Sequence, residues 1–148
     1  MIDIIDNEVS AFIGVAFSDK IVYNIVERDG EFINTGKSII NFLKYNKNKF
    51  VGKLIESQSY DSITILLDDK MVYGNYFSNQ NSNIDSFTDV YTLIKEANNW
   101  EHFYIYDMFK DLLYIKIPEI DSVVALDYKN DIDSKNFINN IKNGVYNG

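Results

Sequence analysis

The chain has 148 residues, of which 46% are apolar and 24% charged, and its formal net charge is −8 at pH 7. This length fits one domain with a sizeable core, so we expect residues 1–148 to form a single domain. The absence of cysteine excludes disulfides and thiolate zinc sites. The negative charge argues against a nucleic-acid partner, because phosphate backbones would repel the protein.

The first ten residues carry three acids and no basic residue, which is unlike a signal peptide. No apolar run approaches the roughly 20 residues of a membrane helix. We therefore expect a cytoplasmic protein without a membrane partner.

Local hydrophobic patterns divide the first third of the chain into a hairpin and a helix. Residues 12–17 and 21–26 are apolar runs on either side of the polar turn 18–20, which is typical of a β-hairpin. The stretch 38–57 has apolar residues three and four positions apart, which predicts a helix.

The same order returns in the middle of the chain. Residues 63–67 and 71–77 flank the polar turn 68–70. Ser86 and Asp89 have the spacing of a capping box, and the helix predicted there runs to about residue 98. Residues 12–50 align without gaps to residues 62–100, with seven identities over 39 pairs. Two explanations stay open: an internal duplication, or two similar hairpins built from a limited alphabet.

A third hairpin is predicted from residues 102–106 and 112–117, followed by a strand at 123–128 and a short helix around Phe137 and Ile141. The expected fold is α+β in the order ββα-ββα-βββα. Hairpins predict an antiparallel sheet of about six or seven strands, with two or three helices packed on it. The runs 12–17 and 63–67 are apolar at nearly every position, so we expect both to be central strands covered on both faces.

Motifs for catalysis are missing from this pattern. Gly36-Lys37-Ser38 precedes a helix, but a phosphate-binding loop needs glycine five residues before Gly36, where Glu31 stands. His102 is the only histidine, so a histidine metal cluster is impossible and a structural role is favoured. We therefore predict no enzyme activity, no cofactor and no metal.

Several acidic and tyrosine side chains are candidates for contact with a partner. An acidic residue in a turn can be explained by its hydrogen bonds to the nearby backbone, and a tyrosine in a strand can be explained by packing in the sheet. The same residue types also serve at interfaces, where tyrosine is enriched and acids meet basic surfaces. The predicted partner-binding residues are Asp68, Asp69, Tyr73, Tyr76, Asp127, Asp131 and Asp133.

These features favour a non-catalytic binding protein that neutralises a basic protein. Its concrete form would be a bacterial immunity protein or antitoxin whose acids fill the basic cleft of a nuclease-type toxin domain. Three alternatives remain open. They are a phage-encoded inhibitor of a host protein, a small carboxylate-dependent hydrolase or transferase, and a structural assembly module that forms a homo-oligomer.

Overall fold

The computed structural model describes residues 9–17, 21–26, 30–56, 62–67, 70–75, 83–84, 90–96, 101–120, 122–130, 132 and 136–143. Along the chain its elements are β1 (Ala11–Ala16), β2 (Ile21–Val26), the π-helical turn η1 (Phe32–Gly36), α1 (Lys37–Glu56), β3 (Ser62–Leu67), β4 (Lys70–Asn75), β5 (Asn83–Ile84), α2 (Val90–Glu96), β6 (Phe103–Asp107), β7 (Leu112–Lys116), β8 (Val124–Leu126) and α3 (Phe137–Lys142). The predicted α+β class is confirmed, and the predicted hairpins form at nearly the predicted residues.

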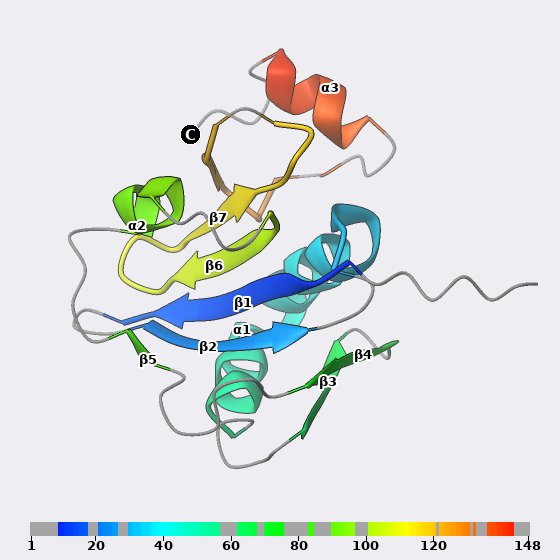
Figure 1. Ribbon diagram of the computed structural model, residues 1–148, viewed down its shortest axis with the longest axis vertical. Coiled ribbons are helices and arrows are strands. Elements are labelled where there is room, and N and C mark those ends of the chain that lie inside the picture. The colour runs from blue at the N-terminus through cyan, green and yellow to red at the C-terminus, as the bar shows by residue number, and fades with distance from the viewer. Residues whose placement is uncertain are drawn as a thin grey trace, which may run out of the picture.

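The main sheet is mixed, with strand order β5-β2-β1-β6-β7-β8 (Figure 1). Five of these strands have three or more residues, and the two-residue β5 extends one edge. Neighbouring strands are antiparallel except at the centre, where β1 and β6 run parallel with Ile13 opposite Tyr104. The prediction of an antiparallel sheet was therefore wrong. Hairpins are antiparallel internally, but two hairpins can join through strands that run the same way.

The second hairpin lies outside this sheet. β3 and β4 pair only with each other, as a two-stranded sheet next to β2 and α1 (Figure 1). The prediction that residues 63–67 form a central strand was wrong, because apolar content alone does not choose a strand's neighbours. Both halves of the proposed repeat, 12–50 and 62–100, contain a hairpin before a helix, yet the two hairpins occupy different places in the fold.

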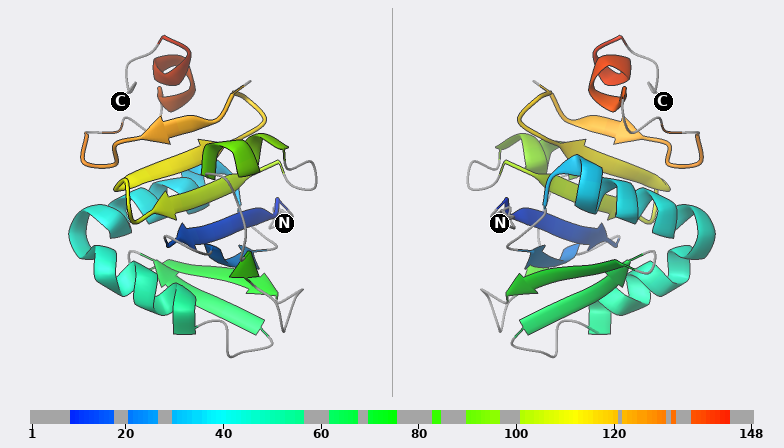
Figure 2. Two further views of the ribbon diagram at one scale, coloured as in Figure 1. Left: turned by 90° about the vertical axis from the view of Figure 1, so that its left-hand side faces the viewer. Right: turned by 90° about the vertical axis from the view of Figure 1, so that its right-hand side faces the viewer.

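Helices cover both faces of the main sheet (Figure 2). On one face, α1 and α3 pack on Ile13, Val15 and Tyr106 through side chains such as Phe50 and Phe137. On the other face, α2 packs on alternate strand residues through Val90 and Ile94. β1 is buried along its whole length, which confirms its predicted central place and explains its continuous apolar run.

Candidate interaction surfaces

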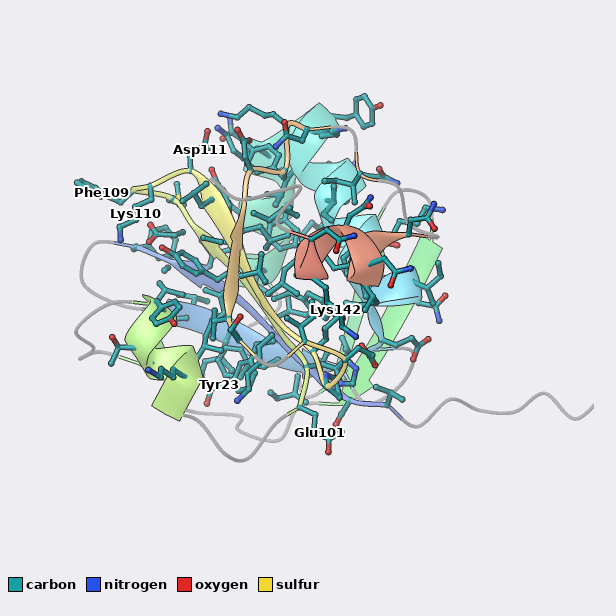
Figure 3. All side chains as sticks on the ribbon, turned by 90° about the horizontal axis from the view of Figure 1, so that it is seen from above. Tyr23, Glu101, Phe109, Lys110, Asp111 and Lys142 are labelled. Atoms are coloured by element: carbon teal, nitrogen blue, oxygen red, sulfur yellow. The ribbon has the colours of Figure 1, made fainter. Side chains whose placement is uncertain are left out.

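Asp111 collects hydrogen bonds from three parts of the chain at the end of the sheet where β6 turns into β7 (Figure 3). The hydroxyls of Tyr106 and Tyr128 donate to its Oδ1 atom over 2.6 and 2.7 Å. Lys129 Nζ lies 3.2 Å from Oδ2, and Lys47 Nζ lies 3.5 Å from Oδ1. Because Lys47 belongs to α1 and Tyr128 follows β8, one carboxylate ties the β6–β7 turn to the long helix and to the last strand.

The charge states in this cluster follow from its hydrogen bonds. Burial alone would raise the pKa of Asp111, but the bonds from Tyr106, Tyr128 and Lys129 outweigh it and hold the pKa well below its ordinary value. Burial and the bond to Asp111 raise the pKa of both tyrosines. A general acid or base works best with a pKa near the working pH. Near neutral pH the two tyrosines therefore stay protonated and Asp111 stays ionised. Such a cluster suits holding the turn in place rather than transferring protons.

The turn between β6 and β7 is fixed by its own hydrogen bonds and exposes a large apolar side chain. Asp107 Oδ1 accepts from the backbone N–H of Phe109 over 2.9 Å and of Lys110 over 3.1 Å. The N–H of Met108 donates to the carbonyl of Ala16 over 3.1 Å. Phe109 is 85% exposed and Met108 41% exposed at the tip. The turn thus presents an aromatic ring on an ordered backbone.

A second exposed ring lies on α1 near the same end. Tyr45 is 81% exposed and stands two residues before Lys47, which contacts Asp111. Next to it, Asn46 departs from helical geometry with φ −158° and ψ 66°. The Asn46 side chain then accepts from the N–H of Lys49 over 3.3 Å, as a capping residue does at a helix start. The second part of α1 therefore begins at this kink, next to the exposed Tyr45.

The opposite end of β6 is acidic (Figure 3). His102 is buried directly before the strand, and its carbonyl accepts from Phe12 N over 2.9 Å. Burial lowers the pKa of His102, while the charges of Glu119, Glu101 and Glu31 act against that shift. Glu101 and Glu119 are exposed, and no ion pair between described residues engages either of them. Three carboxylates thus lie within electrostatic range of one buried imidazole.

The Gly36-Lys37-Ser38 motif is part of the packed core, not a phosphate loop. Ser38 is buried, and its hydroxyl donates to the Asn34 carbonyl over 2.8 Å. A Cβ on Gly36 would lie 2.5 Å from a ring atom of Phe32 and 2.9 Å from one of Tyr104. Close packing therefore explains the glycine.

The predicted partner-binding residues are only partly covered by the structure. Asp127 lies beside the Asp111 cluster, where its Oδ1 accepts from Lys129 N over 3.0 Å. Tyr73 is placed by its backbone alone, opposite Thr64 in the β3–β4 pair. The remaining predicted residues lie outside the described ones and stay predictions: Asp68, Asp69, Tyr76, Asp131 and Asp133.

Sequence reasoning missed the residues that the structure makes most conspicuous. Asp111 and Phe109 lie in a segment that the sequence shows only as a short link between two strands. The available signal was a pair of apolar residues, Met108 and Phe109, in the short link between two strands. No local signal pairs Asp111 with Lys47 or Tyr128, because the contact depends on the tertiary fold.

Within the described part of the chain, no group of three or more His, Asp or Glu side chains could hold a metal ion. No helix in that part is long and apolar enough to cross a membrane.

Comparison of the chain with protein-family models, with curated proteins and with solved structures finds no match. Its function is therefore argued from the two ends of β6 and from the charge of the chain.

Proposed function

We propose that this chain is a non-catalytic binding protein that occupies and neutralises a basic protein. In its concrete form it is a bacterial immunity protein or antitoxin, and its target is a nuclease-type toxin domain. The observation that carries the proposal is the acidic end of β6, formed by Glu31, Glu101 and Glu119.

The geometry of this end suits recognition of a cationic surface. Glu101 and Glu119 are exposed and come from different loops, one before β6 and one after β7. The antiparallel pairing of β6 with β7, Phe103 opposite Lys116, brings these loops to the same edge of the sheet. A nuclease binds phosphates through basic side chains, and carboxylates form charge-assisted hydrogen bonds with the same groups.

The net charge of −8 adds a longer-range effect. A strongly negative protein meets a basic partner faster than a neutral one does, and salt reduces that advantage. The order of the β1–β6 junction supports tight binding, since a preorganised surface loses little entropy on association. Here the Tyr104 hydroxyl, which donates to the Gly30 carbonyl over 2.8 Å, fastens the segment before Glu31 to the sheet.

The experiment is a binding assay of the purified chain against a panel of basic nuclease-type toxin domains. The double variant Glu101→Gln/Glu119→Gln is compared with Lys49→Gln/Lys53→Gln, which changes two charges on α1 away from this end. The proposal expects the glutamate variant to lose affinity and the lysine variant to keep it. Equal affinity of the two variants, or no binding to any domain, would refute it.

A further inference from the structure

The two ends of β6 differ in charge, and both expose apolar side chains. Figure 3 shows Phe109 and Lys110 on one side of the molecule and Glu101 on the other. Four of the five exposed large hydrophobic residues in the described part belong to these ends: Ile33, Tyr45, Met108 and Phe109. Scattered apolar residues are normal on a protein surface, but apolar patches rimmed by polar residues mark contact sites.

At the Phe109 end the lysine side chains are more exposed than the aspartates. Lys129 and Lys47 have side chains 60% and 41% exposed, compared with 34% for Asp111 and 38% for Asp127. Asp107 is buried. Lys110 is exposed directly beside Phe109, and no ion pair between described residues engages it. Lys110 is therefore the charge beside the aromatic tip that no described ion pair balances.

At the Glu101 end the exposed charge is negative and an apolar surface lies next to it. Ile33 is 51% exposed and stands two residues after Glu31. Pro118 is exposed and directly precedes Glu119. This end therefore offers apolar groups beside carboxylates, as the other end offers Phe109 and Met108 beside Lys110.

The two ends are far enough apart to act separately. β6 has five residues, and a strand rises about 3.3 Å per residue, so roughly 17 Å separates its ends. That distance exceeds the Debye length of about 8 Å at physiological ionic strength. Each end therefore presents its own charge to a neighbouring molecule.

We propose that the chain self-associates head to tail, with the Phe109 turn of one copy seated on the acidic end of a second copy. Phe109 and Met108 contact Ile33 and Pro118, and Lys110 pairs with Glu101 or Glu119. The occupant is a second copy because the same chain supplies both complementary surfaces. The contact uses the same acidic end that is proposed to meet a basic protein, so a second copy and that partner would compete for it.

Such a contact is heterologous, because it joins two different patches. In a dimer, one copy keeps a free Phe109 turn and the other keeps a free acidic end. Further copies can therefore add at both ends until a ring closes. The net charge of −8 on every copy opposes assembly. The contact is small, with one aromatic anchor and few charges, so we expect weak association of the transient kind.

Two variants that each destroy one end provide the test. Phe109→Ser/Lys110→Ser removes the tip and keeps the acidic end, while Glu101→Lys/Glu119→Lys does the reverse. Sedimentation velocity should show wild-type mass rising with concentration up to about 1 mM, the range of weak complexes. Each variant alone should stay monomeric. An equimolar mixture should form a dimer and nothing larger, because the intact tip of one fits the intact acidic end of the other.

Circular dichroism and melting curves establish that both variants fold, and their altered residues are exposed, so little loss of stability is expected. Three results would overturn the proposal: a wild-type chain that stays monomeric throughout, a mixture of the variants that stays monomeric, or a variant that associates alone as strongly as wild type. The last result would indicate a symmetric contact or unspecific aggregation.

Discussion

The hydroxyl of Tyr106 donates a 2.6 Å hydrogen bond to the carboxylate of Asp111, the residue at which the chain turns into β7 with φ 55°. Positive φ is uncommon outside glycine, and Asp and Asn tolerate it best. The hydrogen bond therefore holds a backbone position that most residues avoid. It also fixes the turn that carries Phe109.

The acceptor at Asp111 should matter for stability. In Asp111→Ala the buried Tyr106 and Tyr128 lose their common acceptor. Leaving buried donors without partners costs roughly 1–3 kcal/mol of unfolding free energy. Asp111→Asn keeps an acceptor oxygen and tolerates positive φ, so its loss should be smaller. Urea denaturation measures both, with Asp127→Asn as a nearby control. Unchanged stability in Asp111→Ala would show that the cluster adds nothing.

Low pH should remove the stabilising contribution of Asp111. Because the folded state holds the pKa of Asp111 below its ordinary value, its stabilising effect is complete above the unfolded pKa of about 3.9 and is lost as pH falls further. The stability difference between wild type and Asp111→Asn should therefore narrow as pH falls below about 4. Urea titrations between pH 2 and pH 7 test this, and a difference that stays constant with pH would contradict it.

His102 should give a second pH effect in a higher range. Burial lowers its pKa in the folded state, so the neutral ring is favoured there. The contribution is complete above the unfolded pKa of about 6.5 and is lost as pH falls through the folded pKa. Wild-type stability should therefore decline below about pH 6.5 more steeply than that of His102→Asn. The comparison uses slopes against pH, so a constant loss from the substitution does not affect it. Parallel slopes would show that His102 titrates alike in both states.

Local elements were predictable from the sequence, because a hairpin needs only two adjacent apolar runs and a turn. β1–β2 and β6–β7 are of this kind, and their predicted and observed bounds agree closely. The parallel pairing of β1 with β6 was not predictable. It joins segments distant in sequence, and nothing in the apolar run of either strand specifies its neighbour across the sheet.

The residues of the candidate surfaces were predicted less well, for the same reason. Asp127 was named as a contact residue because it is one of three acids around the last loop, and it lies beside the charged cluster. Lys47, Tyr106 and Asp111 meet only because α1 crosses the end of β6. Glu31 and Glu119 likewise act on the charge of His102 from separate loops. The pattern of a single sequence does not show which distant residues come into contact in the fold.

Two glycines on neighbouring elements should respond oppositely to alanine. Gly36→Ala would place a methyl group against Phe32 and Tyr104, and overpacking of this kind costs about 1–3 kcal/mol. Gly52→Ala meets open space within α1, where alanine is favoured over glycine by up to about 1 kcal/mol. Thermal melts of both variants test these two opposite effects.

Thermal melts of the wild-type chain with and without ATP test the explanation of Gly36 as a packing residue. A wild-type melting temperature that rises with ATP would instead support nucleotide binding near Gly36, because a ligand that binds the native state stabilises it.

The central claim is that the acidic end of β6 recognises a basic protein, and its most direct test is the association rate across a salt series. Stopped-flow mixing with a basic toxin domain that binds the chain should show fast association that slows as salt rises. In Glu101→Gln/Glu119→Gln the rate at low salt should fall and its salt dependence should flatten, because charges at the rim of a contact act on association. Lys49→Gln/Lys53→Gln should bind at least as fast as wild type. Rates that are independent of salt, or the same in the glutamate variant and wild type, would contradict the claim.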